Sequence, residues 1–235
     1  RMHSAKFFLD GVLENRTAAM IAPYSDPPGG NAPLMFTPGQ INDLFVAFDA
    51  ARFQIHAHAI GDLAVRAALD GIAAARAANG FWPAWHQIAH VQCIDPADLP
   101  RFAALGAVAN IQPLWARAEP SVTEIAVPMA GPERARWIYA FRSLRDAGAM
   151  LALSSDWTVS TLNPFEIIET AITRQPPRKE GTHPAFFPEE RLTLAECVEG
   201  YTVNAAIAGW RGHETGSLSP GKWADLILLD RDIYA

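Results

Sequence analysis

Five short apolar segments of the sequence each contain a residue that can bind a metal ion or support a metal site. The segments are residues 6–11, 53–60, 87–91, 107–112 and 150–156, and they hold Lys6, His56, His58, His90, Gln112 and Asp156. Imidazole and carboxylate groups are common ligands of zinc and other divalent metals. The pattern therefore predicts one metal-dependent site assembled from distant parts of the chain.

The segments between these apolar runs predict helices, many of them rich in alanine. Helices are expected at about residues 38–52, 62–79, 95–105, 133–148, 164–174 and 193–208. Strands that alternate with helices indicate an α/β fold with a parallel sheet, as in a (β/α) barrel. Because the ends of the barrel strands build the active site in that fold, the candidate residues are expected to meet there.

Composition excludes several classes of function. The chain has 235 residues, half of them hydrophobic, so it can bury a substantial core, and its net charge of −6 gives no basic surface for nucleic acid. No apolar stretch approaches the roughly 20 residues needed to span a bilayer. Residues 1–6 lack the apolar core of a signal peptide, and a cytoplasmic location is the expectation. Cys93 and Cys197 lack the spacing of a zinc or redox motif and are interpreted as buried thiols.

Four motifs together support a family resemblance. They are His-Ala-Ile-Gly-Asp at 58–62, Ile-Ala-His-Val-Gln at 88–92, Ser-Ser-Asp-Trp at 154–157, and the segment 216–225 with its Gly-Lys-Trp-Ala-Asp ending. In this order they resemble the amidohydrolase superfamily, specifically its amidohydrolase 3 branch of YtcJ-like and N-substituted formamide deformylase-like proteins. The resemblance covers nearly all of the chain.

The resemblance also implies how the chain is organised. Members of the family begin with a small β-sandwich segment and a first barrel strand that carries a His-x-His pair, and nothing before Lys6 matches either. The chain therefore looks like the C-terminal portion of a longer enzyme. Residues 1–212 are expected to form a partial (β/α)8 TIM-type barrel, about strands four to eight, and residues 213–235 a turn and a strand of the β-sandwich.

Spacing alone does not choose between the paired histidines. His56 and His58 are two residues apart on a strand and should point to the same face. His86 and His90 are four residues apart and should likewise share a face. Position favours His58 and His90, which lie nearer the C-terminal ends of their strands, and the resemblance agrees for His58. His56 is then a packed interior histidine.

Asp156 ends the most apolar strand, where a carboxylate is costly to bury unless a metal or hydrogen bonds compensate. The alternative is an N-cap of the following turn, which Ser154, Ser155 and Asp156 all favour. The resemblance implies that Asp156 holds a metal and accepts the proton of the attacking water.

Lys6 shares a face with Phe8 and Asp10 in an apolar strand, and burial would favour its neutral amine. YtcJ-like proteins have a lysine in a similar Lys-x-x-x-Asp-Gly context, which implies a carbamate that acts as a bridging metal ligand. The alternative is a solvated lysine near a chain end.

Three other candidates have simpler interpretations. Asp62 is expected to cap the helix that follows His58, with a supporting role at the site as the alternative. Trp115 and Trp157 either line a substrate pocket or pack in the core. Arg174 is interpreted as a cation at a helix end rather than as a clamp for an anion.

The resulting hypothesis is a metal-dependent hydrolase that cleaves a non-peptide carbon–nitrogen bond, an amide or a formamide. Lys6, His58, His90 and Asp156 are the candidate metal ligands, and Asp156 and His90 the candidate catalytic residues. Zinc suits this set, as one or two ions, although iron, nickel or manganese are alternatives.

The expected partner is a small amide-type substrate, and exposed sheet edges predict a homo-oligomer. The alternatives are an inactive scaffold or ligand-binding half-barrel, and a metal-dependent lyase or isomerase.

Overall fold

A computed structural model describes residues 3–178 and 183–234 of the chain. Its strands form a single five-stranded sheet in the order β1-β2-β3-β4-β5, and each neighbouring pair is parallel. The strands are β1 (Ser4–Phe8), β2 (Gln54–Ala59), β3 (Gln87–His90), β4 (Val108–Ile111) and β5 (Met150–Leu153). Strands β2 to β5 lie inside four of the five apolar segments and β1 overlaps the first, so the expected α/β fold with a parallel sheet is confirmed.

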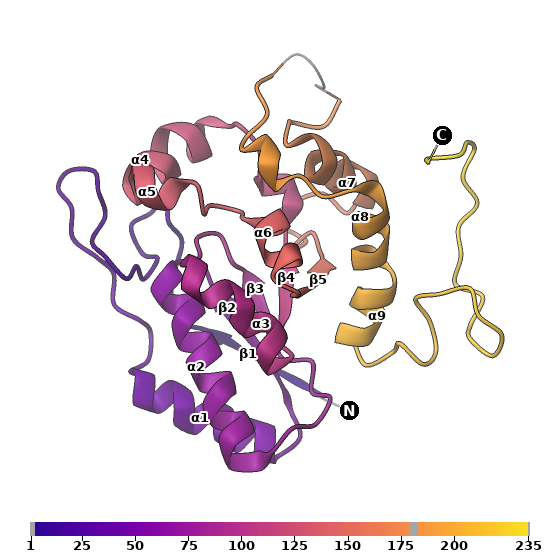
Figure 1. Ribbon diagram of the computed structural model, residues 1–235, viewed down its shortest axis with the longest axis horizontal. Helices are drawn as coiled ribbons and strands as arrows, with labels where there is room; N and C mark the ends of the chain where they lie inside the picture. Colours follow the sequence, from indigo (N-terminus) through magenta and orange to yellow (C-terminus); the bar gives the residue numbers. More distant parts are fainter. Residues whose placement is uncertain (1–2, 179–182, 235) are drawn as a thin grey trace.

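Helices connect the strands and pack against the sheet (Figure 1). The α-helices are α1 (Pro38–Ala50), α2 (Asp62–Asn79), α3 (Leu99–Leu105), α4 (Val127–Ala130), α5 (Pro132–Ala135), α6 (Phe141–Asp146), α7 (Pro164–Thr173), α8 (Leu194–Tyr201) and α9 (Val203–Ala208). Shorter turns are η1 (Pro96–Asp98), η2 (Pro113–Trp115), η4 (Pro188–Glu190) and the π-helix η3 (Ser121–Ala126). Among the described helices, none is long and apolar enough to cross a membrane.

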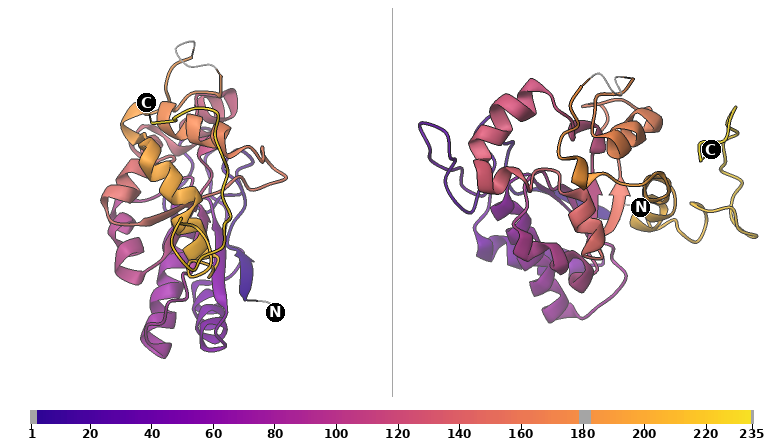
Figure 2. Two further views of the ribbon diagram at one scale, coloured as in Figure 1. Left: turned by 90° about the vertical axis from the view of Figure 1, so that its right-hand side faces the viewer. Right: turned by 45° about the horizontal axis from the view of Figure 1, so that its top comes forward.

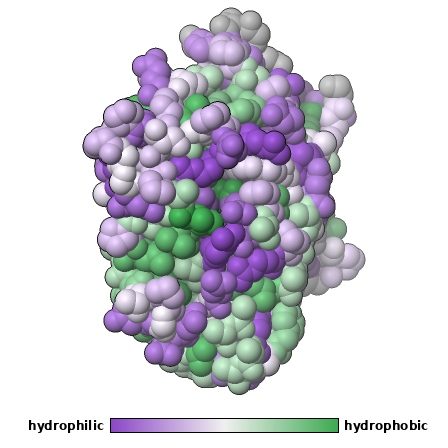
Figure 3. Space-filling model, turned by 60° about the vertical axis from the view of Figure 1, so that its left-hand side comes forward, coloured by the Kyte–Doolittle hydropathy of each residue, from purple (hydrophilic) through white to green (hydrophobic). Residues whose placement is uncertain are grey.

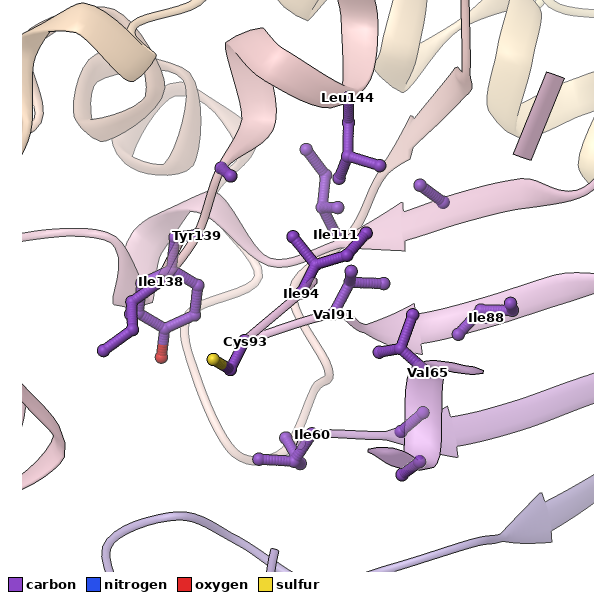
Figure 4. Close-up of a cluster of buried hydrophobic side chains, with 14 of the residues drawn as sticks. Ile60, Val65, Ile88, Val91, Cys93, Ile94, Ile111, Ile138, Tyr139 and Leu144 are labelled. Atoms are coloured by element: carbon purple, nitrogen blue, oxygen red, sulfur yellow. The ribbon is translucent and has the colours of Figure 1, made fainter. Parts of the chain in front are cut away.

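The main core lies between the sheet and the helices that follow its strands. Figure 4 shows Ile88 of β3 and Ile111 of β4 in one buried cluster with Val65 of α2 and Leu144 of α6. Cys93 is completely buried in the same cluster, which confirms its interpretation as a buried thiol. Burial of such side chains is the main favourable term in folding, so this cluster holds the helices against the sheet.

Two predicted helices are interrupted. The segment 133–148 contains α5 and α6, separated at Tyr139, whose φ of 54° belongs to the left-handed region. The segment 193–208 contains α8 and α9, separated at Thr202. The sequence Thr193-Leu-Ala-Glu196 has the capping-box pattern, and the capping box is present at the start of α8. Local sequence thus predicted the helix start, whereas tertiary contacts determine the breaks.

The predicted C-terminal strand is absent from the described residues, and this part of the fold prediction is wrong for the structure. Residues 213–234 form turns and an extended segment that lies apart from the sheet (Figures 1 and 2). A strand needs a neighbour to satisfy its backbone donors and acceptors. The tail meets no such neighbour among the described strands, and Leu228 is 95% exposed.

The molecular surface is mixed. On the face shown in Figure 3, apolar residues gather in patches between hydrophilic ones. Several large apolar side chains are exposed, and they cluster in two stretches of sequence: Trp157, Val159 and Leu162 after β5, and Leu226, Ile227 and Leu228 in the tail. Exposed apolar patches of this kind often mark interaction surfaces.

Candidate active site

All four candidate ligands line one cavity of about 510 Å³. Lys6 comes from β1, His58 from β2, His90 from the end of β3, and Asp156 from the turn after β5. Parallel strands bring their C-terminal ends to the same edge of a sheet, which explains why residues 150 positions apart meet. The cavity is the candidate active site.

His58 and His56 occupy different depths, as position suggested. In the register of β1 and β2, Lys6 pairs with His56 and Phe8 with His58, so all four side chains share a face. Only His58 of the two histidines lines the cavity. His56 lies one pleat deeper, where burial, with Lys6 and His58 nearby, lowers its pKa to about 4.

The orientation of the His58 ring follows from one hydrogen bond. Its Nε2 lies 2.8 Å from the carbonyl oxygen of Gly11. A carbonyl only accepts, so Nε2 carries the hydrogen and Nδ1 keeps a free lone pair, a tautomer assigned from its partner. Burial lowers the pKa of His58, although the bond to Gly11 acts in the opposite direction. A neutral imidazole with one free nitrogen is the form that binds metals.

Asp10 holds this corner of the site together, a role that its sequence context did not predict. Its buried carboxylate accepts hydrogen bonds from the backbone N–H groups of Ala19, Ile60 and Gly61, at 2.8–3.0 Å. Burial raises the pKa of Asp10 to about 6, against the effect of these three bonds. Because Gly11 follows Asp10 directly, the same anchor positions the carbonyl that His58 contacts.

His90 reaches the cavity through an unusual backbone conformation. Its strand neighbour Ala89 pairs with His58, so regular alternation would place His90 on the opposite face. A φ of 79° at His90 turns the chain, and the ring faces His58 with 4.5 Å between ring centroids. Residues held in the left-handed region concentrate at functional sites. Asp156, with a φ of 50°, is a second example.

Gln112 fixes the His90 ring. Its amide Nε2 donates to Asn110 Oδ1 and Ser154 Oγ, at 3.0 and 2.7 Å, so its Oε1 is the atom that faces His90 Nδ1 at 2.8 Å. His90 therefore donates from Nδ1 and keeps a free lone pair on Nε2. Burial lowers the pKa of His90 to about 3, helped by the nearby His58. Trp115 stacks on the ring at 5.6 Å, so this tryptophan lines the pocket and also packs against the core.

Asp156 is half-buried at the cavity wall. The capping role considered for this position belongs to its neighbour, because Trp157 N donates to Ser155 Oγ at 3.2 Å. In the described structure the Asp156 carboxylate makes no hydrogen bond or ion pair with another side chain, and it raises the pKa of His58. It is thus available to act on a ligand.

His86 and His90 do not share an environment, contrary to the expectation of a common face. His86 is buried on the helix side of β3, where its Nε2 lies 2.8 Å from Asp49 Oδ1 of α1. Its Nδ1 accepts from the backbone N–H of Ile55 at 3.0 Å. Both ring nitrogens thus have hydrogen-bond partners that fit the neutral imidazole. Burial lowers the pKa of His86 to about 4. This histidine is structural.

We expect His86→Gln to lower the free energy of unfolding, and we expect this difference from wild type to become smaller as the pH falls from 7 to 4.5. An unfolded His86 has an ordinary pKa near 6.5 and binds a proton that the folded form excludes, so its contribution is complete above pH 6.5 and is lost below it. The shift corresponds to roughly 2 kcal/mol over this range. Urea unfolding at several pH values measures it, and the exposed His213→Gln is the control. An unfolding free-energy difference between wild type and His86→Gln that is independent of pH would contradict this assignment.

Two weaker candidates have structural roles. Asp62 is not the N-cap of α2, which is Gly61, and its carboxylate instead accepts from Ile21 N at 2.7 Å. Arg174 does end α7, but its side chain is fully buried and donates to the carbonyls of Phe186 and Tyr139. Burial lowers the pKa of Arg174 to about 10. It braces the segment that carries Tyr139, a residue of the cavity wall.

Comparisons with known proteins agree on one family. A profile described as the amidohydrolase family matches residues 1–235. Protein LONG AFTER FAR-RED 3 of Arabidopsis thaliana is 34% identical over 230 residues, 97% of this chain and 38% of that protein. Putative amidohydrolase YtcJ of Bacillus subtilis is 26% identical over 231 residues, 98% of this chain and 42% of that protein. The chain spans about two-fifths of the length of these two relatives.

Two further matches concern chemistry and structure. N-substituted formamide deformylase of Arthrobacter pascens is 40% identical over 95 residues, 40% of this chain and 17% of that protein. The crystal structure of an uncharacterized metal-dependent hydrolase from Pyrococcus furiosus aligns with a TM-score of 0.82 and 27% identity, over 99% of this chain and 45% of that chain.

The residues present fit part of a metal site. Two neutral imidazoles face each other, each with one free nitrogen, and the Asp156 carboxylate lines the same cavity. These are suitable donors for a divalent metal. Within residues 3–178 and 183–234, however, no three His, Cys, Asp or Glu side chains are grouped closely enough to hold an ion. The described donors thus supply a pair of ligands rather than a full set.

Proposed function

The chain belongs to the amidohydrolase family, in the branch expected from its motifs, and from this premise we propose that it carries part of the active site of a metal-dependent hydrolase. The proposed reaction is hydrolysis of a non-peptide carbon–nitrogen bond, an amide or a formamide. The observation that carries the proposal is the facing pair His58 and His90 in a cavity that also contains Lys6 and Asp156.

The proposed roles combine the geometry of the cavity with what the family resemblance implies. Nδ1 of His58 and Nε2 of His90 would hold the metal, with Asp156 and a carboxylated Lys6 as further ligands. A bound divalent metal, zinc by the preference of imidazole and carboxylate donors, supplies a Lewis acid for the scissile carbonyl and for water. Asp156 accepts the proton of the attacking water and passes it to the leaving nitrogen. The oxyanion role expected for His90 does not fit this arrangement, because its Nδ1–H donates to Gln112 and its Nε2 lone pair would hold the metal.

The proposed architecture places this site within a larger fold. The five parallel strands are proposed to be the fourth to eighth strands of a (β/α)8 barrel, and residues 213–235 a separate segment. Strand order and parallel pairing support the first part. An experimental structure of the whole protein in which β1 and β5 pair with no further strands would contradict it.

Hydrolysis of simple N-formyl and N-acetyl amines by the whole protein tests the proposed reaction. Amine and carboxylate should appear in equal amounts, activity should disappear after dialysis against a chelator, and it should return with zinc. Turnover that is unaffected by metal removal, or an unsaturated product without carboxylate, would contradict a metal-dependent hydrolase. The second candidate, a binding scaffold, is favoured by the lack of a group of three ligands among the described residues. It predicts stoichiometric ligand binding without turnover.

A further inference from the structure

The cavity contains a carboxylate that the proposed reaction does not use. Glu14, in the turn after β1, lines the same cavity as the two histidines. Its Oε1 accepts a hydrogen bond from Gln92 Nε2 at 2.8 Å, and Gln92 is only 2% exposed. A buried amide that donates to one carboxylate oxygen restricts the orientation of the other. Glu14 is therefore a positioned group rather than a freely moving surface side chain.

The charge of Glu14 is not compensated by a neighbouring side chain. The second glutamate of the cavity, Glu119, forms an ion pair with Arg117. In the part of the chain that the structure describes, Glu14 forms no ion pair with Lys, Arg or His. The Glu14 carboxylate thus keeps an unpaired negative charge at the cavity wall, which attracts a cation and repels an anion.

Much of the cavity lining is apolar and aromatic. It includes Phe8, Trp115 and Tyr139, together with Val12, Ile60 and Val122. Glu14 is close enough to Tyr139 to act on its phenol: burial raises the pKa of Tyr139 most, and Glu14 contributes in the same direction. Aromatic faces attract cations, and a carboxylate beside them adds a charged hydrogen-bond acceptor. An apolar group that bears a cationic nitrogen matches both features.

We infer that the cavity selects substrates that carry a protonated amine on an apolar or aromatic group, with Glu14 as the counter-ion. This inference rests on the proposed function, because it names the substrate class of the same site. Glu14 acts as a specificity residue: it binds the ammonium group, and the scissile bond then lies toward His58 and His90.

The test compares two small probes that differ mainly in charge, benzylammonium and benzyl alcohol. Calorimetric titration of the whole protein at pH 7 should show that benzylammonium binds roughly tenfold more tightly, a difference of about 1.4 kcal/mol. Glu14→Gln keeps the shape of the side chain and should reduce this preference to near unity. The matched control is Glu124→Gln, which removes the same charge from an exposed position on η3, outside the cavity. It should preserve the preference.

Equal affinity for the two probes would overturn the inference, as would failure of both to bind or a preference that survives Glu14→Gln. Circular dichroism of the variant separates loss of folding from loss of the counter-ion. Because binding is measured without turnover, this result is independent of the hydrolysis assay. A protein that hydrolyses amides but binds both probes equally keeps the proposed function and loses the inference. A protein that prefers benzylammonium but hydrolyses nothing keeps the cation site and loses the proposed reaction.

Discussion

Replacing His58 or His90 with alanine should remove bound metal and hydrolytic activity together, whereas His56→Ala should leave most of both. His58 and His90 each keep a free ring nitrogen in the cavity, and no other described histidine lines it. His56 lies deeper on the same face and lines no part of the cavity. Removing a residue that only supports a metal ligand weakens metal binding by up to about 100-fold. Loss of a direct ligand should therefore reduce metal affinity by at least about 100-fold.

A graded series makes this prediction sharper. Gln112→Ala removes the acceptor that fixes His90 Nδ1, and it should weaken metal binding by about 10- to 100-fold without abolishing it. Metal content by elemental analysis, measured beside activity on one preparation of each variant, gives the order of effects. His56→Ala is expected to lower mainly the unfolding temperature. If His56→Ala empties the site while His58→Ala does not, the choice within this pair is wrong.

The positions of the site residues were predictable because they depend on a simple geometric rule. Parallel strands that alternate with helices place their C-terminal ends together, so residues at or near these ends were expected to lie at one edge of the sheet. Lys6, His58, His90 and Asp156 accordingly line one cavity. Their roles as ligands stay a prediction, as does the oligomeric state.

The supporting residues were not predictable, because their roles depend on loops that fold back. Asp10 meets backbone groups up to 51 positions away, and Glu14 meets Gln92 at a separation of 78. The left-handed backbone at His90 also has no signature in the local sequence, and without it the ring would face the helices. Gln92 ends the motif at 88–92, and Asp10 belongs to the Lys-x-x-x-Asp-Gly pattern that begins at Lys6. These family patterns are the signal that could have led to both residues.

The predicted C-terminal strand failed for a related reason. Alternating and apolar residues at 223–229 describe a segment that is able to form a strand, but a ladder needs a second strand in reach. The described residues provide none, and the side chains remain exposed. The polar, proline-rich segment 175–190 is typical of a loop, and its residues 179–182 lie outside the described structure.

Asp156→Asn should reduce the turnover number by about 10²- to 10⁴-fold, the range expected when a positioned general base is lost. The amide has the shape of the carboxylate but cannot accept the proton of the attacking water. The side chain is half-buried, lines the cavity and makes no hydrogen bond with another described side chain, so its replacement removes no structural contact. The unfolding temperature should therefore change little, and the loss should appear in turnover rather than in folding.

A second substitution at the same position separates catalysis from capping. Serine is a good N-cap, so Asp156→Ser would retain both stability and activity if the role of Asp156 were to start the following turn. If Asp156 is the general base, serine should be as inactive as asparagine, because neither side chain can take a proton at neutral pH. The described turn already has a side-chain acceptor in Ser155, which bonds Trp157 N. Steady-state rates and thermal unfolding of both variants measure this difference, and more than a tenth of wild-type turnover in either variant would assign proton transfer to another group.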